Sequence, residues 1–380
     1  MAAKNGLQCA LMAPTEILAE QHYRSLAPLL EPLGIPCALL TASTKARERR
    51  ALNERLRSGE LSLVIGTHAL LSPDVQYQNL GLVVTDEQHR FGVDQRAALS
   101  AKGDDPHLLV MSATPIPRTL ALMIYGDLDV SILNELPPGR QKIDTFAVPS
   151  SYHERIYAFL RKLVAEGRQA YIVCPLIEES DALEARSAEK VYDELSKGVL
   201  KSVRCALLHG RLKPAEKEAI MADFVAGATQ VLVSTTVIEV GVNVPNATLM
   251  VIENAERFGL AQLHQLRGRV GRGSEQSYCV LLTGVDTPEA LARLQVVRDS
   301  EDGFYLAEKD MEQRGVGQLF GLKQHGLPDL RIADIIRDTD TIVEVRKLAQ
   351  EELSKPNALD EIHQLVQLQF GDRFAMIFNT

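Results

Sequence analysis

Short apolar runs alternate along the chain with longer segments whose apolar residues recur at helical spacing. In the N-terminal third, the runs that predict β-strands are residues 7–12, 37–40, 61–65, 80–85 and 108–112. Helices are predicted at 16–32 and 44–57, and Thr15 stands where its side chain can cap the first of them. Strands that alternate with helices are typical of parallel α/β domains.

The same alternation returns in the middle of the chain. Its strand candidates are 170–173, 205–208, 231–234, 248–252 and 277–282, with helical patterns at 151–166, 180–196, 214–226 and 259–267. The segment 134–150, which contains Pro137-Pro138-Gly139-Arg140, predicts a linker. We therefore predict two α/β domains in tandem, at 1–140 and 145–287, followed by a mostly helical region at 288–380.

Composition narrows the class of protein. No apolar run approaches the ~20 residues that a membrane-spanning helix needs, and the first residues lack the apolar core of a signal peptide. The five cysteines form no C-x-x-C pair, which predicts buried thiols in a reducing cytoplasm and argues against a zinc site. A net charge of −9 argues against a chain coated in phosphate contacts. The basic segment 45–57 is better explained as a solvated helix face than as a DNA contact.

An acidic pair follows the predicted strand 80–85, in the string Asp86-Glu87-Gln88-His89. Parallel α/β sheets bind ligands at the carboxyl ends of their strands. Nucleoside triphosphate hydrolysis needs Mg²⁺ near the β and γ phosphates and a positioned water. Asp86 can hold the ion through water, and Glu87 can polarise the attacking water. Taken alone, such a pair is weak evidence, because acidic residues at strand ends are common.

An arginine-rich string, Gln265-Leu266-Arg267-Gly268-Arg269-Val270-Gly271-Arg272, follows the last predicted helix of the second domain. Its glycines allow the backbone to approach a phosphate. Its guanidinium groups can offset the charge that grows on a transferred phosphoryl group. The alternative interpretation is a basic helix end that pairs with surface acids.

Hydroxyl-bearing residues follow several other predicted strands. They are Thr15, Thr67 with His68, and Ser112-Ala113-Thr114, each suited to contacting sugar-phosphate oxygens or to relaying between two sites. Taken singly, all of them can be ordinary caps and turns. Their order along the chain, with His209-Gly210-Arg211, the segment 235–241 and the arginine string, is that of a superfamily 2 helicase.

Longer strings are similar to the RecG family of branched-DNA helicases. They are Gly66-Thr67-His68-Ala69-Leu70, residues 86–93, residues 111–120 and residues 262–269. Residues 298–326 resemble the translocation motif that this family shares with the transcription-repair coupling factor. The resemblance implies two tandem RecA-like domains, the first of them N-terminally truncated, and a helical C-terminal region. It also implies the use of ATP and Mg²⁺.

The resemblance assigns roles to individual residues. Asp86 would hold Mg²⁺ and Glu87 would act on water, with Gln265, Arg269 and Arg272 completing the ATP site. Gly241 and Asn243 would bind nucleotide together with Arg269 and Arg272. The residues implied to contact DNA or to couple it to the nucleotide are Thr15, Thr67, His68, His89, Ser112, Thr114, Thr235, Arg314 and Gln324.

Two departures from the family pattern affect the expected activity. No G-x-x-x-x-G-K-[ST] loop and no wedge domain occur in the 380 residues, so we expect this chain alone to be deficient in ATP hydrolysis. We also expect a loosened first domain, with the strands 80–85 and 108–112 exposing unpaired edges. A smaller departure is Asn243, where the family usually carries Asp, so a weakened contact is expected there.

The expected partners are branched double-stranded DNA and the single-stranded-DNA-binding protein, for a protein that is monomeric when complete, cytoplasmic and not membrane-bound. Two alternatives stay open. One is the transcription-repair coupling factor, which shares the translocation motif but for which a different continuation of the acidic string is expected. The other is a DNA-binding or adaptor fragment without ATPase activity.

Overall fold

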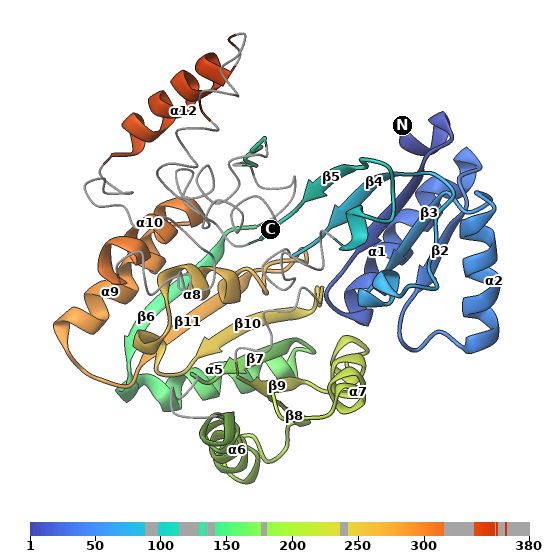
Figure 1. Cartoon of the computed structure of the whole chain (residues 1–380). Helices are drawn as coiled ribbons and strands as arrows, with labels where there is room; N and C mark the ends of the chain where they lie inside the picture. The colour runs from blue at the N-terminus through green and yellow to red at the C-terminus, as the bar shows by residue number, and fades with distance from the viewer. Residues whose placement is uncertain are drawn as a thin grey trace. The chain divides into compact units, whose positions relative to one another are not determined.

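The structure, a computed structural model, describes residues 1–87, 98–113, 129–133, 135, 141–175, 181–235, 242–314, 338–353, 355 and 362. The chain divides into two compact units. The first unit, residues 1–114, 137–258 and 262–299, contains two separate β-sheets (Figure 1). The second unit comprises residues 115–136, 259–261 and 300–380.

The first sheet has the strand order β2-β3-β1-β4-β5, and all its pairings are parallel. Its strands are β1 (Gln8–Met12), β2 (Cys37–Leu40), β3 (Leu63–Gly66), β4 (Leu80–Thr85) and β5 (His107–Val110). The helices α1 (Glu16–Leu30) and α2 (Ala46–Arg57) connect the first three strands. Each predicted strand of this domain is therefore confirmed to within two residues.

Alternation along β1 divides the core of this sheet into two clusters. Ala10 and Met12 pack in a cluster that includes Leu52 and Leu56 of α2. Leu11, which points to the opposite face, packs with Leu18 of α1 and its neighbours. Helices thus cover both faces of the sheet, as expected for buried parallel strands.

The edge of the first sheet corrects one expectation. We expected 80–85 to expose an unpaired edge, but β4 lies between β1 and β5 and pairs with both. Only β5 stands at this edge among the described strands, and Leu109 on it is 50% exposed. The difference arises because β5 itself covers the second edge of β4.

The second sheet has the order β6-β11-β10-β7-β9-β8 and is also parallel throughout its described pairings. Its strands are β6 (Ile143–Pro149), β7 (Gln169–Val173), β8 (Cys205–Leu208), β9 (Val231–Ser234), β10 (Ala247–Ile252) and β11 (Ser277–Thr283). Its helices are α5 (His153–Ala165), α6 (Asp181–Lys197), α7 (Pro214–Val225) and α8 (Leu260–Arg267).

The predicted linker at 134–150 is partly wrong, because β6 occupies 143–149. This strand pairs with β11 over seven residues, from Ile143 opposite Ser277 to Pro149 opposite Thr283. Its residues are exposed or half-buried, as befits an edge strand, so the segment lacks the continuous apolar run of an interior strand. The neighbouring Pro and Gly residues strengthened the false impression of a loop.

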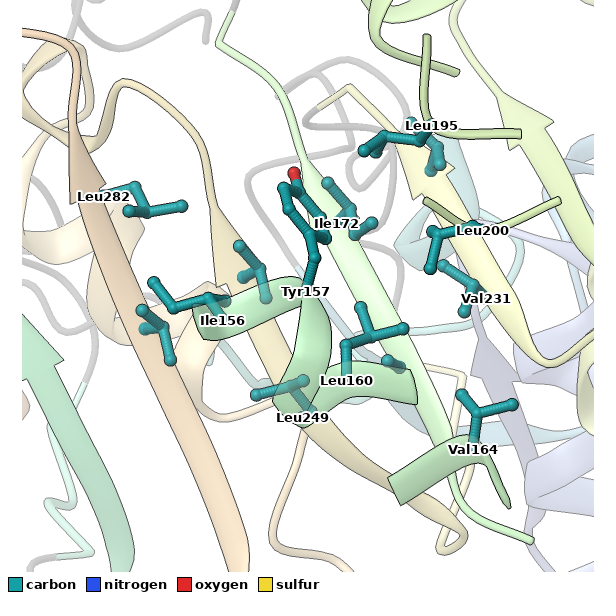
Figure 2. Packing of buried hydrophobic residues seen from close by; sticks show 14 of the residues in the cluster. Ile156, Tyr157, Leu160, Val164, Ile172, Leu195, Leu200, Val231, Leu249 and Leu282 are labelled. Atoms are coloured by element: carbon teal, nitrogen blue, oxygen red, sulfur yellow. The ribbon is translucent and has the colours of Figure 1, made fainter. Parts of the chain in front are cut away.

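The main core of the second sheet lies under α5 and α6 (Figure 2). Ile156 and Leu160 of α5 pack with Ile172 of β7 and Leu249 of β10, and Leu195 of α6 joins the same cluster. Three further described helices follow the sheet, namely α9 (Pro288–Asp299), α10 (Gly303–Arg314) and α12 (Thr339–Leu353). They bear out the predicted helical C-terminal region.

Two expectations from composition can be compared with the fold. Among the residues that the structure describes, no helix is both long enough and apolar enough to cross a bilayer. All five cysteines are free thiols, but only Cys174 and Cys279 are fully buried, and the other three are half-buried. Burial raises the pKa of the Cys174 thiol to about 12, so that thiol is unreactive.

Candidate functional site

The acidic pair lies directly beyond β4, where the chain leaves the sheet. The backbone N–H of Asp86 donates to the carbonyl of Met12 at the end of β1, which extends the sheet pairing by one residue (3.0 Å). The next residue, Glu87, has a φ of 53°, in the left-handed region. A non-glycine residue pays roughly 1–2 kcal/mol for this conformation, and such strain is concentrated at functional sites.

Both carboxylate oxygens of Asp86 are hydrogen-bonded within the chain. Oδ1 accepts from the backbone N–H of Glu87 at 2.9 Å. Oδ2 lies 2.8 Å from Nε2 of His22, a residue of α1. Because a carboxylate oxygen accepts, the imidazole Nε2 donates in this contact. His22 was not among the predicted residues, because nothing in the sequence indicates which face of α1 meets the acidic pair.

The arginine string supplies the opposite charge. Arg269, just beyond α8, is 6% exposed, and its Nη2 lies 3.9 Å from Oε1 of Glu87, which is 7% exposed. Arg272 is more exposed, and its Nε donates to the carbonyl of Gly268 at 3.2 Å. Between them, Gly271 has a φ of 73°, and a Cβ there would come within 2.8 Å of Ile143. Glycine is therefore required at that turn.

These residues line one cavity of about 350 Å³. The five predicted catalytic residues all contribute to its wall, namely Asp86, Glu87, Gln265, Arg269 and Arg272. Other lining residues were not predicted from the sequence, among them Gln21, His22 and Ser25 of α1, and His264 of α8. The acidic pair and α1, which line one part of the cavity, belong to the domain of the first sheet. The residues of α8 and the arginines, which line the rest, belong to the domain of the second sheet.

Arginine side chains connect α8 and the residues just before it to the later helix α9. Arg293 of α9 donates to the carbonyls of Glu256 and Phe258 at 3.0 and 2.6 Å. Arg267 donates to the carbonyl of Val297 on the same helix α9 at 2.6 Å. These bonds to backbone carbonyls fix the segment that carries the cavity's arginines.

The hydroxyl residues behave in several ways. The Thr15 side chain accepts from the backbone N–H of Leu18 and caps α1, so the interpretation as a cap is confirmed. Thr67 and Thr235 are 2% and 1% exposed, and neither Oγ1 has a hydrogen-bond partner among the described residues. His68 and Ser112 are exposed. All of these roles toward DNA stay predictions.

Asn243 is exposed, and its backbone N–H donates to Oε1 of Gln21 at 3.4 Å. Other predicted residues lie outside the described part of the structure. These are His89, Thr114, Gly241, Gln324 and the side chain of Arg314, although the backbone of Arg314 ends α10.

The donor set fits a magnesium ion shared with a nucleotide. Among the described residues, no group of three or more His, Cys, Asp or Glu side chains could hold a metal by itself. Mg²⁺ needs fewer protein ligands, because it keeps several waters and takes the rest from substrate phosphates. The Asp86 side chain is 20% exposed and faces the cavity, so it can supply the one carboxylate that such a site requires.

Two parallel sheets, an acidic pair beyond β4 and arginines beyond α8 define a superfamily 2 helicase motor. Comparison with protein families agrees, since residues 1–123 match the DEAD/DEAH box helicase family and residues 154–274 match the helicase conserved C-terminal domain. Residues 300–368 match the family described as ATP-dependent DNA helicase RecG, domain 3, C-terminal.

The chain belongs to the RecG family. It is 51% identical over 373 residues to the ATP-dependent DNA helicase RecG of Synechocystis. The aligned region covers 98% of this chain and 45% of that protein. It is 52% identical over 334 residues to RecG of Bacillus subtilis, covering 88% of this chain and 49% of that protein. The chain thus spans about half the length of these relatives.

One solved structure supports the same family, and a second shows the same fold. RecG bound to a three-way DNA junction is 48% identical, with a TM-score of 0.74 over 89% of this chain and 44% of that one. The helicase MrfA bound to DNA and AMPPNP is 17% identical with a TM-score of 0.58, over 79% of this chain and 45% of that one. At that identity the second likeness shows the fold alone.

Proposed function

We propose that these 380 residues form the motor region of an ATP-dependent DNA helicase that acts on branched DNA. The observation that carries the proposal is the convergence of Asp86, Glu87, Gln265, Arg269 and Arg272 on one cavity. These residues come from two distant segments of the sequence, and only the fold brings them together. The solved structure of RecG bound to a three-way DNA junction supports the choice of branched DNA as the substrate.

The roles follow from the chemistry of each group. Asp86 presents a carboxylate to the cavity and would hold Mg²⁺ shared with the phosphates of ATP, whose charge the ion would help to neutralise. Glu87 would accept a proton from the attacking water. Arg269 and Arg272 supply positive charge where negative charge develops during phosphoryl transfer.

The pairing of Glu87 with Arg269 bears on this chemistry. Both residues are more than nine-tenths buried, and a charge in such a place needs a partner of opposite sign. When ATP enters, its phosphates would compete for Arg269. Nucleotide binding would therefore change the charge that stands beside the proposed base.

Hydrolysis also requires a phosphate-binding loop, and the 380 residues contain no G-x-x-x-x-G-K-[ST] string. We therefore propose that a polypeptide of these residues alone hydrolyses ATP only at background. An extended polypeptide, in which a RecG segment with such a loop precedes these residues, should show turnover stimulated by a three-way junction.

The test compares the two polypeptides for ATP hydrolysis with and without the junction. Junction-stimulated turnover by the 380-residue polypeptide would contradict the proposed deficiency. An inactive extended polypeptide that still binds the junction would instead favour a DNA-binding or adaptor role without hydrolysis.

A further inference from the structure

Among the described hydrogen bonds, the one between His22 and Asp86 joins the acidic pair to α1. His22 lies in the second turn of that helix, and Thr15 caps the helix at its start. Its Nε2 is 2.8 Å from Asp86 Oδ2, and the two side chains are 28% and 20% exposed. Both residues line the cavity, so the contact borders the space in which the nucleotide would bind.

The contact fixes the rotation of the Asp86 carboxylate. One oxygen is held by the Glu87 backbone N–H at 2.9 Å, and the other is held by the imidazole. Without the imidazole, only the backbone bond would orient the group. Groups that hydrogen-bond to a metal-binding residue commonly set its orientation, and their removal costs 10–100-fold in metal affinity.

We propose that His22 is a positioning residue that orients Asp86 toward the metal–nucleotide complex and ties it to α1. The inference rests on the proposed function. It adds a mechanical consequence, because the helix capped by Thr15 and the carboxylate then move as one body. A displacement of the start of α1 by DNA would reach the acidic pair through the six residues between Thr15 and His22.

One test needs no substitution. In the 380-residue polypeptide labelled with ¹⁵N-histidine, the NMR spectrum reports which ring nitrogen carries the proton. The geometry requires a proton on Nε2 of His22, because that nitrogen donates to Asp86. A His22 ring protonated on Nδ1 alone would overturn the proposal.

A second test measures metal affinity in the extended polypeptide. Mn²⁺ binding in the presence of a non-hydrolysable ATP analogue is followed by electron paramagnetic resonance. His22→Leu removes the donor and should weaken Mn²⁺ binding about tenfold or more. His22→Gln places an amide N–H near the position of Nε2 and should restore most of the affinity.

Ser25→Ala is the matched control. Ser25 lines the same cavity from the same helix, but its hydroxyl donates to the carbonyl of Gln21 and makes no described contact with Asp86. Equal weakening by Ser25→Ala, or unchanged affinity in His22→Leu, would overturn the role of His22. If the unsubstituted extended polypeptide binds neither Mn²⁺ nor nucleotide, the proposed function itself fails.

Discussion

Each sheet has an acidic residue directly after a strand, Asp86 after β4 and Glu253 after β10, yet the surroundings of the two carboxylates differ. The backbone N–H of Asp86 donates to the carbonyl of Met12 at the end of β1, and that of Glu253 donates to the carbonyl of Val173 at the end of β7 (3.0 and 2.8 Å). The following residues, Glu87 and Asn254, have φ values of 53° and 47°. The backbone of one sheet therefore repeats the turn of the other.

A histidine meets each acid, but from a different helix. His22 of α1 contacts Asp86, and His153 of α5 contacts Glu253, each at 2.8 Å through Nε2. Glu253 also accepts from the Tyr157 hydroxyl at 2.6 Å, which closes off its second oxygen. Asp86 has no such hydroxyl among its described contacts and faces a cavity. The same turn thus yields a closed structural acid in one sheet and an open one in the other.

The opposite ends of the two sheets do not differ in this way. Gln8 begins β1 and Gln169 begins β7, and each is 3% exposed. Each side-chain amide donates to the penultimate residue of a helix and to a residue just before the next strand. The acceptors are the carbonyls of Leu56 and Leu61 for Gln8, and of Phe224 and Thr229 for Gln169. The two sheets therefore share the same side-chain contacts at the ends where β1 and β7 begin. They differ at the opposite ends, where the acidic residues lie and where the first sheet borders the cavity.

The largest expected effect is on the second residue of each turn. Glu87→Gln in the extended polypeptide should lower junction-stimulated turnover about 10³-fold, because the amide cannot accept the proton of water. Nucleotide binding should persist. Asn254→Asp, the matched change in the other sheet, should leave turnover nearly unchanged. A large loss in Asn254→Asp would mean that the second turn is not merely structural.

The arginines sharpen the same contrast. Arg272→Ala should lower turnover about 10³-fold, the effect typical of a lost charge partner for the transferred phosphoryl group. Steady-state hydrolysis by the extended polypeptide measures it. A loss of less than tenfold would move that role to Arg269, the guanidinium that already contacts Glu87.

A smaller effect is expected where the second acid is closed. Tyr157→Phe removes the hydroxyl that donates a hydrogen bond to Glu253. The buried Oε1 of Glu253 then loses that donor. The expected loss is ~1–3 kcal/mol of unfolding free energy, measured by denaturant titration of the 380-residue polypeptide. Tyr192→Phe is the control, because its hydroxyl makes a 3.4 Å bond to a backbone carbonyl and no described contact with a carboxylate. Equal losses in the two variants would remove the special role of Glu253.

The smallest expected effect is on pH dependence. The hydrogen bond from His153 to Glu253 raises the pKa of His153 above its ordinary value of 6.5. A group whose folded pKa is raised stabilises the fold fully below its unfolded pKa, and this contribution fades as pH rises through the folded pKa. The unfolding free energy should therefore fall as pH rises above about 6.5. His153→Gln should flatten that decline, and an unchanged slope would contradict the assignment.

Much of this arrangement was accessible from the sequence. The interior strands could be predicted because they are short apolar runs. The order of the motifs indicated that the acids and arginines belong to one site. The edge strand β6 was missed because its residues are exposed or half-buried and form no continuous apolar run. His22 was missed because a helical pattern gives the spacing of residues on α1 but not the carboxylate that each will meet. That pairing depends on how α1 packs against the sheet.

Thr67 and Thr235 also occupy matching places, directly after β3 and β9, beside the central strands of their sheets. Neither hydroxyl has a hydrogen-bond partner in the described part of the chain, and a buried hydroxyl in that state costs the unbound protein ~1 kcal/mol or more. Under the proposed function, a phosphate oxygen of DNA would accept from each hydroxyl and remove that cost. Stability and affinity would then oppose one another at both positions. Replacing either threonine with valine would make the unbound protein harder to unfold and its complex with DNA easier to dissociate.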